Sequence, residues 1–165
     1  LGYQVEDERH LPQCIPHEVR DKLHISTIPR NMHPEYDKER RQARIQALKQ
    51  ILERTNSKEE NVRYTDAAAY RTNDRFAISV VDEKGEELTA TSIRAKDAST
   101  AEELGIALAI ATCKKTLVTV VTDSQEACRR YVNGRIGKAS LQVLNNTETE
   151  AAHTLWTPGH KSLAG

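Results

Sequence analysis

Three acidic residues far apart in the chain occupy positions where a carboxylate needs an explanation. Asp66 interrupts YTDAAAY, a strand-like run of small and apolar residues, although Asp is depleted in strands. Asp123 ends the β-branched run LVTVVTD, and Glu103 lies in the first turn of a predicted helix. A buried carboxylate without a partner is costly, so these groups need a common one. Three acids that converge on one point would bind a hard cation such as Mg²⁺ or Mn²⁺ through oxygen ligands.

Two of these acids also have a simpler interpretation. Asp123 and Glu103 could merely stabilise helix N-termini, where acidic residues are favoured. That interpretation does not explain Asp66, which lies inside a strand. The two-residue period of a strand puts Asp66 on the face of Tyr64, and Asp123 on the face of Val121. The carboxyl end of a central parallel strand, where Asp123 stands, is a favoured place for a site in an open α/β sheet.

The order of elements predicts a mixed α/β domain that brings these acids together. Strands are predicted at residues 62–70, 75–81 and 87–95, and then a helix begins with Ser99 or Thr100 as its N-cap and Glu102 or Glu103 three residues later. A buried parallel strand follows at 117–123, then a helix capped by Ser124 and ended by Gly134. A short helix at 139–146 and a strand at 152–160 complete the order β-β-β-α-β-α-β. Three antiparallel strands thus lead into parallel strands through helical crossovers.

The first sixty residues have a different character. Residues 1–33 contain three prolines and no clear period, which predicts irregular structure. A helix at about 34–54 follows, and its apolar stripe is formed by Ile45, Leu48, Ile51 and Leu52. Arg40, Arg41 and Arg44 lie largely off this stripe. They could contact a nucleic-acid backbone, although a solvated helix face is the simpler interpretation.

Composition limits the classes of function. The 165 residues include 24 Lys and Arg and 24 Asp and Glu, so the formal net charge is zero. A local patch or metal ions would therefore have to attract any polyanion. Aromatic residues make up 4%, which disfavours a stacking platform for single strands. The N-terminus is polar and acidic and no long apolar run occurs, so we expect an intracellular protein, in the cytoplasm or the nucleus, without signal peptide or transmembrane segment.

Cysteine, histidine and serine residues give weaker signals. Three widely spaced cysteines indicate a reducing compartment rather than a disulfide framework. The spacing of His10, Cys14, His17 and His24 matches no structural zinc pattern. A Ser-His-Asp hydrolase is disfavoured because no nucleophile elbow is present.

Several segments, in their order, resemble the ribonuclease H fold of type 1. They are YTDAAAY, STAEELGIALAIA, VTDSQEA and LWTPGHKSLAG. The segment IPRNMHPEYDKERRQARIQAL, taken with VRYTDAAAY, resembles non-LTR retrotransposon polyproteins of the tick transposon kind, in which a reverse transcriptase precedes the ribonuclease H module. The resemblance implies a five-stranded mixed sheet in the order 3-2-1-4-5, flanked by helices. Residues 1–60 would then be a connector from the reverse transcriptase, and residues 61–165 the ribonuclease H-like domain.

The resemblance also implies a mechanism and a set of site residues. Asp66, Glu103 and Asp123 would hold two Mg²⁺ or Mn²⁺ ions against the scissile phosphate of an RNA strand paired with DNA. Glu103 is chosen over Glu102 because it directly precedes a Leu, as the glutamate of the family does. His160 would assist proton transfer or product release. Gln125 and Ser124 would contact the substrate.

One departure from the family pattern sets an alternative. The family's fourth carboxylate would lie beyond Gly165, so we expect residues 61–165 to be an incomplete domain with weak metal binding and low cleavage. The alternative is therefore a catalytically inactive ribonuclease H-like remnant that serves only as a nucleic-acid-binding or structural module.

Overall fold

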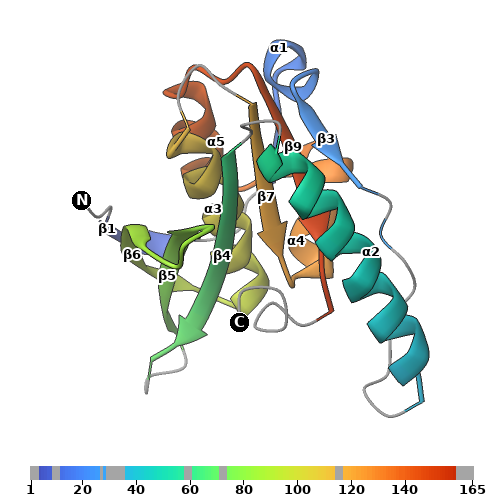
Figure 1. Ribbon diagram of the computed structural model, residues 1–165. Coiled ribbons are helices and arrows are strands. Elements are labelled where there is room, and N and C mark those ends of the chain that lie inside the picture. Colours follow the sequence, from blue (N-terminus) through green and yellow to red (C-terminus); the bar gives the residue numbers. More distant parts are fainter. Residues whose placement is uncertain are drawn as a thin grey trace.

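The protein is described here from a computed structural model, which covers residues 4–8, 12–26, 28, 36–57, 61–70, 74–113 and 117–158 (Figure 1). Its strands are β1 (Gln4–Glu8), β2 (Gln13–Cys14), β3 (Leu23–Ile25), β4 (Asn61–Ala69), β5 (Arg75–Asp82), β6 (Glu87–Ala95), β7 (Leu117–Thr122), β8 (Arg135–Ile136) and β9 (Ala151–Trp156). Within the described ranges, seven of them form one mixed sheet in the order β1-β6-β5-β4-β7-β9-β3. β2 and β8 form a separate antiparallel pair.

The five predicted strands occupy the centre of this sheet in the predicted order. β4 pairs antiparallel with β5, and β5 pairs antiparallel with β6. On its other side β4 pairs parallel with β7, which in turn pairs parallel with β9. Among these five strands, β4 is therefore the one at which the pairing changes from antiparallel to parallel.

The prediction of five strands, with residues 1–33 irregular, is wrong. β1 pairs parallel with β6 at one edge, and β3 pairs parallel with β9 at the other. Both added strands are short and lie at sheet edges, where they satisfy backbone groups that would otherwise stay unpaired. Because edge pairing uses backbone groups, it needs no hydrophobic period that a sequence would reveal. The proposed domain boundary at residue 60 stays a prediction.

The helices are α1 (His17–Arg20), α2 (Lys38–Ser57), α3 (Ala98–Ala111), α4 (Gln125–Val132) and α5 (Lys138–Asn145). The predicted cap of α4 is confirmed, because Ser124 Oγ accepts a hydrogen bond from the Ala127 amide. Gly134, with a φ of 71°, follows α4 as predicted.

The predicted N-cap of α3 is wrong: Asp97 caps it and accepts from the Thr100 amide at 2.9 Å. Asp is as good a cap as Ser, and it stands two residues earlier than Ser99.

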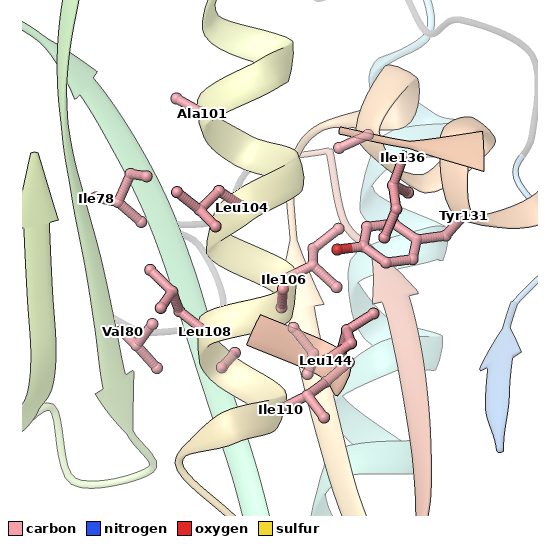
Figure 2. Close-up of a cluster of buried hydrophobic side chains, with 14 of the residues drawn as sticks. Ile78, Val80, Ala101, Leu104, Ile106, Leu108, Ile110, Tyr131, Ile136 and Leu144 are labelled. Atoms are coloured by element: carbon pink, nitrogen blue, oxygen red, sulfur yellow. The ribbon is translucent and has the colours of Figure 1, made fainter. Parts of the chain in front are cut away.

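The main core lies between the sheet and α3, α4 and α5. Residues 100–110 of α3 are all buried, since the sheet covers one side of this helix and the other helices cover the rest. Figure 2 shows Leu104 and Leu108 of α3 facing Ile78 and Val80 of β5, with Ile106 toward Tyr131 of α4. This packing fixes the helix that carries Glu102 and Glu103 against the central strands.

A second core lies on the opposite face of the sheet, under α2. The apolar stripe predicted for this helix is confirmed, because Leu48 and Leu52 are buried and Ile51 packs partly buried beside them. They contact Val62 and Tyr64 of β4. Val121 of β7 and Leu155 of β9 complete this cluster. The sheet therefore has helices on both faces. In Figure 1, α2 lies in front of the sheet, on the face opposite α3.

Candidate metal centre

The candidate site forms where β4 and β7 stop pairing. Their ladder runs from Asn61 opposite Val118 to Tyr64 opposite Val121 and ends there. Beyond this point β4 continues along β5 and β7 continues along β9, so the two strands separate. Asp66 stands two residues after Tyr64, and Asp123 stands two residues after Val121. The separating strands thus leave a gap with one aspartate on each side.

Both aspartates belong to the face of the sheet that α2 covers. Side chains alternate along a strand, so Asp66 shares the face of Tyr64, and the same alternation continued one residue past β7 puts Asp123 on the face of Val121. Tyr64 and Val121 both pack in the core under α2. The shared faces predicted from the sequence are consistent with this placement, and the two carboxylates lie one strand repeat beyond the end of that core.

Glu102 joins the two aspartates from the other side of the sheet. It lies on α3, and its Oε1 accepts a hydrogen bond from the Ala67 amide of β4 at 3.1 Å. One carboxylate oxygen from each of Asp66, Glu102 and Asp123 lies within 4.8 Å of the others. Among the residues that the structure describes, this is the one group of three or more His, Cys, Asp or Glu side chains that lie close enough to share an ion. Three elements distant in sequence thus bring three carboxylates together.

The electrostatics of Glu102 suit a cation. The residue is 6% exposed, and burial, followed by the negative charges of Asp123 and Asp66, raises its pKa to about 8. The Ala67 N–H acts in the opposite direction and is outweighed. Its second oxygen, Oε2, is buried and has no hydrogen-bond partner in the part of the chain that the structure describes. An oxygen-only donor set with a buried unpartnered oxygen fits a hard cation, so these residues could hold a metal ion.

Glu103, which the sequence analysis selected as the ligand, lies elsewhere. Its Oε2 accepts hydrogen bonds from Ser140 Oγ at 2.7 Å and from the Gly137 amide at 3.1 Å. Its Oε1 lies 3.7 Å from Nη1 of Arg130. Consecutive helical residues are about 100° apart, so when Glu102 points to the sheet, Glu103 points to α4 and α5. The choice of Glu103 is therefore corrected to Glu102.

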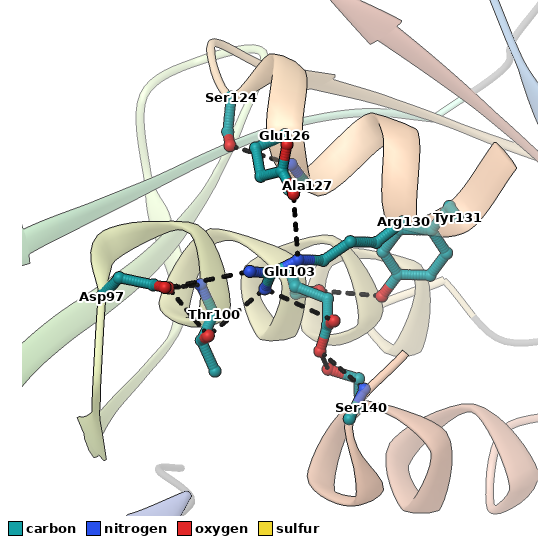
Figure 3. A network of polar contacts seen from close by, with 10 residues as sticks. Asp97, Thr100, Glu103, Ser124, Glu126, Ala127, Arg130, Tyr131 and Ser140 are labelled. Carbon is teal, nitrogen blue, oxygen red and sulfur yellow. Dashed lines mark hydrogen bonds and ion pairs between the residues drawn. The ribbon is translucent and has the colours of Figure 1, made fainter. Parts of the chain in front are cut away.

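Figure 3 shows what Glu103 does instead. Arg130 of α4 lies among Asp97, which caps α3, and Thr100 and Glu103 of that helix. It also reaches Glu126 of its own helix. The Arg130 side chain is 14% exposed and that of Glu103 is 1% exposed, so this is a largely buried ion pair. It joins the first turns of α3 to α4, the helix that begins directly after Asp123 and Ser124.

A signal in the sequence could have distinguished the two glutamates. Gly105 stands three residues after Glu102, on the same face of the helix. A Cβ on Gly105 would collide with the Thr65 side chain of β4, next to Asp66. The glycine thus marks the face of α3 that touches the sheet closely, and Glu102 shares that face while Glu103 does not.

The other predicted site residues have varied outcomes. Ser124 serves as the helix cap, and Gln125 Oε1 accepts a hydrogen bond from Arg129 at 2.9 Å. Both stand directly after Asp123, within reach of the same edge of the sheet. His160 lies outside the described residues.

One contact at the site was not foreseen from the sequence. The Trp156 indole N–H at the end of β9 donates to the backbone oxygen of Asp123 at 3.0 Å. The Thr157 amide likewise donates to the Thr122 backbone oxygen at 2.9 Å. These two bonds extend the pairing of β7 and β9 past the strand ends and hold the backbone that carries Asp123.

Among the N-terminal candidates for zinc, Cys14, His17 and His24 are exposed, and His10 is outside the described residues. His17 pairs with Asp21 at 3.3 Å. Residues 12–26 thus give no support to a zinc site.

No protein-family model and no curated protein sequence matches the chain. Functional inference therefore depends on the geometry of the site. In the part of the chain that the structure covers, no helix has both the length and the apolar character needed to cross a bilayer.

Proposed function

We propose that this protein is a metal-dependent nuclease that hydrolyses the RNA strand of RNA/DNA hybrids, with a type 1 ribonuclease H-like fold. One observation carries the proposal: carboxylates of Asp66, Glu102 and Asp123 from β4, α3 and the end of β7 lie within 4.8 Å of one another. Phosphodiester hydrolysis by Mg²⁺ or Mn²⁺ needs such an oxygen-rich site at a surface that a duplex can reach.

The arrangement of elements supports the same proposal. The order β6-β5-β4-β7-β9 is the order 3-2-1-4-5 of a ribonuclease H-like sheet, and α3 covers the face expected of the helix that carries the glutamate. Asp123 stands at the carboxyl end of a central parallel strand, where sites of open α/β sheets form. In this proposal the chain acts inside the cell next to a reverse transcriptase of the same polyprotein, and the hybrid is its nucleic-acid partner.

In the mechanism, each residue has a distinct task. Asp66, Glu102 and Asp123 would hold two divalent cations, which when bound activate water and stabilise the leaving oxygen. The Ala67 amide orients Glu102 through Oε1, and among the described residues Oε2 has no hydrogen-bond partner that would compete with a cation. Because the pKa of Glu102 is about 8, this carboxyl carries a proton at neutral pH, which it would have to release in order to bind a cation.

The surrounding residues restrict how the site can move. The Trp156 indole N–H donates to the backbone oxygen of Asp123 and so ties this backbone to the end of β9. Gln125 directly follows the capping residue of α4 and would contact the sugar-phosphate backbone. The RNA strand would be distinguished by its 2′-hydroxyl groups and the duplex shape rather than by base sequence.

A cleavage assay with matched variants tests the proposal. The substrate is an RNA/DNA hybrid labelled on the RNA strand, supplied with Mg²⁺ or Mn²⁺. Asp66→Asn, Glu102→Gln and Asp123→Asn should each abolish cleavage. Glu126→Gln removes an exposed carboxylate from α4 that is not in the cluster, so it should cleave like the unchanged chain.

Calorimetry with Mn²⁺ separates the enzyme from an inactive module. Binding that is lost in Asp66→Asn, together with cleavage of the hybrid, supports the nuclease. Failure to bind Mn²⁺ at millimolar concentration would overturn the cation site. Binding of Mn²⁺ without any cleavage would favour the module that only binds nucleic acid.

A further inference from the structure

The helix α2 is strongly basic in a chain that is neutral overall. The chain has equal numbers of basic and acidic residues, whereas KERRQARIQALKQILERTNS of α2 contains six Lys or Arg and two Glu. Residues 38–44 alone contain Lys38, Arg40, Arg41 and Arg44 against one acid, Glu39. The rest of the chain carries the matching negative excess. A surface of this kind is the electrostatic feature expected of a protein that binds a polyanion.

This basic segment lies on the same face of the sheet as the aspartates of the candidate metal centre. Leu48 and Leu52 of α2 pack on Tyr64 and Val121. Asp66 stands two residues after Tyr64 on the same face of β4, and Asp123 directly follows the end of β7, two residues after Val121. The basic segment and the aspartates therefore lie on one face of the sheet, so a duplex bound at the carboxylates on this face would have α2 as a neighbour.

Arginines fix the first half of α2 next to the cluster. Arg41 donates to the Pro158 backbone oxygen at 2.8 Å, and Arg44 donates to the Trp156 backbone oxygen at 3.3 Å. The Arg44 guanidinium also lies 5.8 Å from the centre of the Trp156 ring. Trp156 in turn donates to the backbone of Asp123. A continuous series of contacts therefore connects the basic end of α2 to the carboxylate site.

We propose that the N-terminal half of α2 holds the phosphate backbone of a nucleic-acid duplex while the duplex reaches the carboxylates. This deepens the proposed function, on which it rests, by naming the surface that binds the substrate. Arg41 and Arg44 keep the helix in place, and the exposed side chains of Lys38 and Arg40 contact phosphates. A row of exposed aromatic side chains, which single-strand binding requires, is not found among the described residues of α2.

The test measures binding apart from cleavage. The chain with Asp123→Asn, in a chelator, is titrated into a short fluorescein-labelled RNA/DNA hybrid, and anisotropy is followed over a series of salt concentrations. Lys38→Gln with Arg40→Gln removes two exposed charges that the core does not use. Each lost phosphate contact costs just under a decade of affinity at about 0.1 M salt, so binding should weaken by roughly 60-fold. The slope of log affinity against log salt should become less steep by about 2.

A matched control keeps the total charge change equal. Lys22→Gln with Lys84→Gln also removes two exposed charges, one before β3 and one between β5 and β6. Lys84 follows the end of β5, which pairs with the start of β4. Lys22 precedes β3, which pairs with the start of β9. Both positions therefore lie at the end of the sheet opposite the carboxylates. This pair should leave affinity and salt slope almost unchanged. An equal loss in both double variants would overturn the local surface.

A gain of binding provides an outcome that poor folding cannot imitate. Asp37 lies 3.3 Å from Arg40, and its carboxylate competes with phosphate for that guanidinium. Asp37→Asn should therefore tighten binding severalfold and steepen the salt slope.

Failures of the two proposals are distinguishable. Cleavage by the unchanged chain together with full binding by Lys38→Gln/Arg40→Gln overturns the α2 surface alone. Loss of binding in that variant without any cleavage by the unchanged chain overturns the nuclease alone. Binding to phosphatidylserine vesicles that needs Lys38 and Arg40, without binding to the hybrid, would also overturn the α2 surface.

Discussion

Glu102→Gln isolates the charge of the buried carboxylate. Burial and the neighbouring Asp123 and Asp66 raise the pKa of Glu102 from 4.5 to about 8 in the folded chain. Between these values the folded chain holds a proton that the unfolded chain has released, so the free energy of unfolding falls as pH rises. At about 1.4 kcal/mol per pH unit, the loss reaches up to about 5 kcal/mol at pH 8 and above. Below about pH 4.5 both states are protonated and nothing is lost.

Glutamine is a neutral isostere of the protonated carboxyl, so Glu102→Gln should remove this dependence. At about pH 5 the variant and the unchanged chain should have similar free energies of unfolding. At about pH 8.5 the variant should be more stable by several kcal/mol. A divalent cation should then restore stability to the unchanged chain, because it binds the folded carboxylates, and should have little effect on the variant.

Urea unfolding over a series of pH values, with and without Mn²⁺, measures both effects. Glu126→Gln is the control, since this carboxylate is 55% exposed and contacts Arg130 rather than the cluster. Its curve against pH should follow that of the unchanged chain. Parallel curves for Glu102→Gln and the unchanged chain would show that Glu102 is not held in a charge-repelling site, and the argument for the cation would fail.

Three further substitutions probe the neighbourhood of the site. Asp123→Asn should abolish Mn²⁺ binding in calorimetry and raise the melting temperature of the metal-free chain, since one of the like charges disappears. Gly105→Ala should lower the free energy of unfolding by about 1–3 kcal/mol, because its Cβ meets the Thr65 side chain, and Thr65→Ala should recover part of the loss in urea unfolding. Arg130→Met should cost about 3–5 kcal/mol because it leaves Glu103 buried without its cation. Adding Glu103→Gln should recover much of that loss, and simply additive losses would contradict the pairing.

The central sheet could be predicted because each strand carries its own local signal. Five of the six residues in LVTVVT of β7 are β-branched, and these five are buried. Such a run by itself predicts a parallel strand that is covered on both faces. The stripe of α2 was equally legible, since Leu48 and Leu52 recur at helical spacing. By contrast, β1 and β3 owe their existence to the backbone groups of β6 and β9, which are remote in sequence. The pattern of apolar residues within residues 1–33 therefore could not predict this pairing.

Two of the three carboxylates of the cluster could also be predicted from the sequence. Asp66 and Asp123 were found because a strand fixes the face of every second residue. The glutamate was not, because Glu102 and Glu103 are equally plausible in the first turns of a helix. Their choice depends on the rotation of α3 over the sheet, which is set by the close approach of Gly105 to Thr65. The start of α3 at Asp97, rather than Ser99 or Thr100, was missed for a similar reason: several adjacent residues could cap the helix, and packing selected one.

The distribution of charge separates substrate binding from chemistry. Without cations, the charges of Asp66 and Asp123 repel a phosphodiester, and divalent ions must reverse the sign of the field at the site before a phosphate can enter it. The arginines and lysines of α2 need no ion to attract a phosphate. The basic residues of α2 can therefore bind a duplex when the carboxylates hold no cation. In that complex the scissile phosphate of the duplex would stay away from the carboxylates. Hybrid binding should accordingly survive a chelator and weaken with monovalent salt, whereas cleavage should stop in the chelator at any salt concentration.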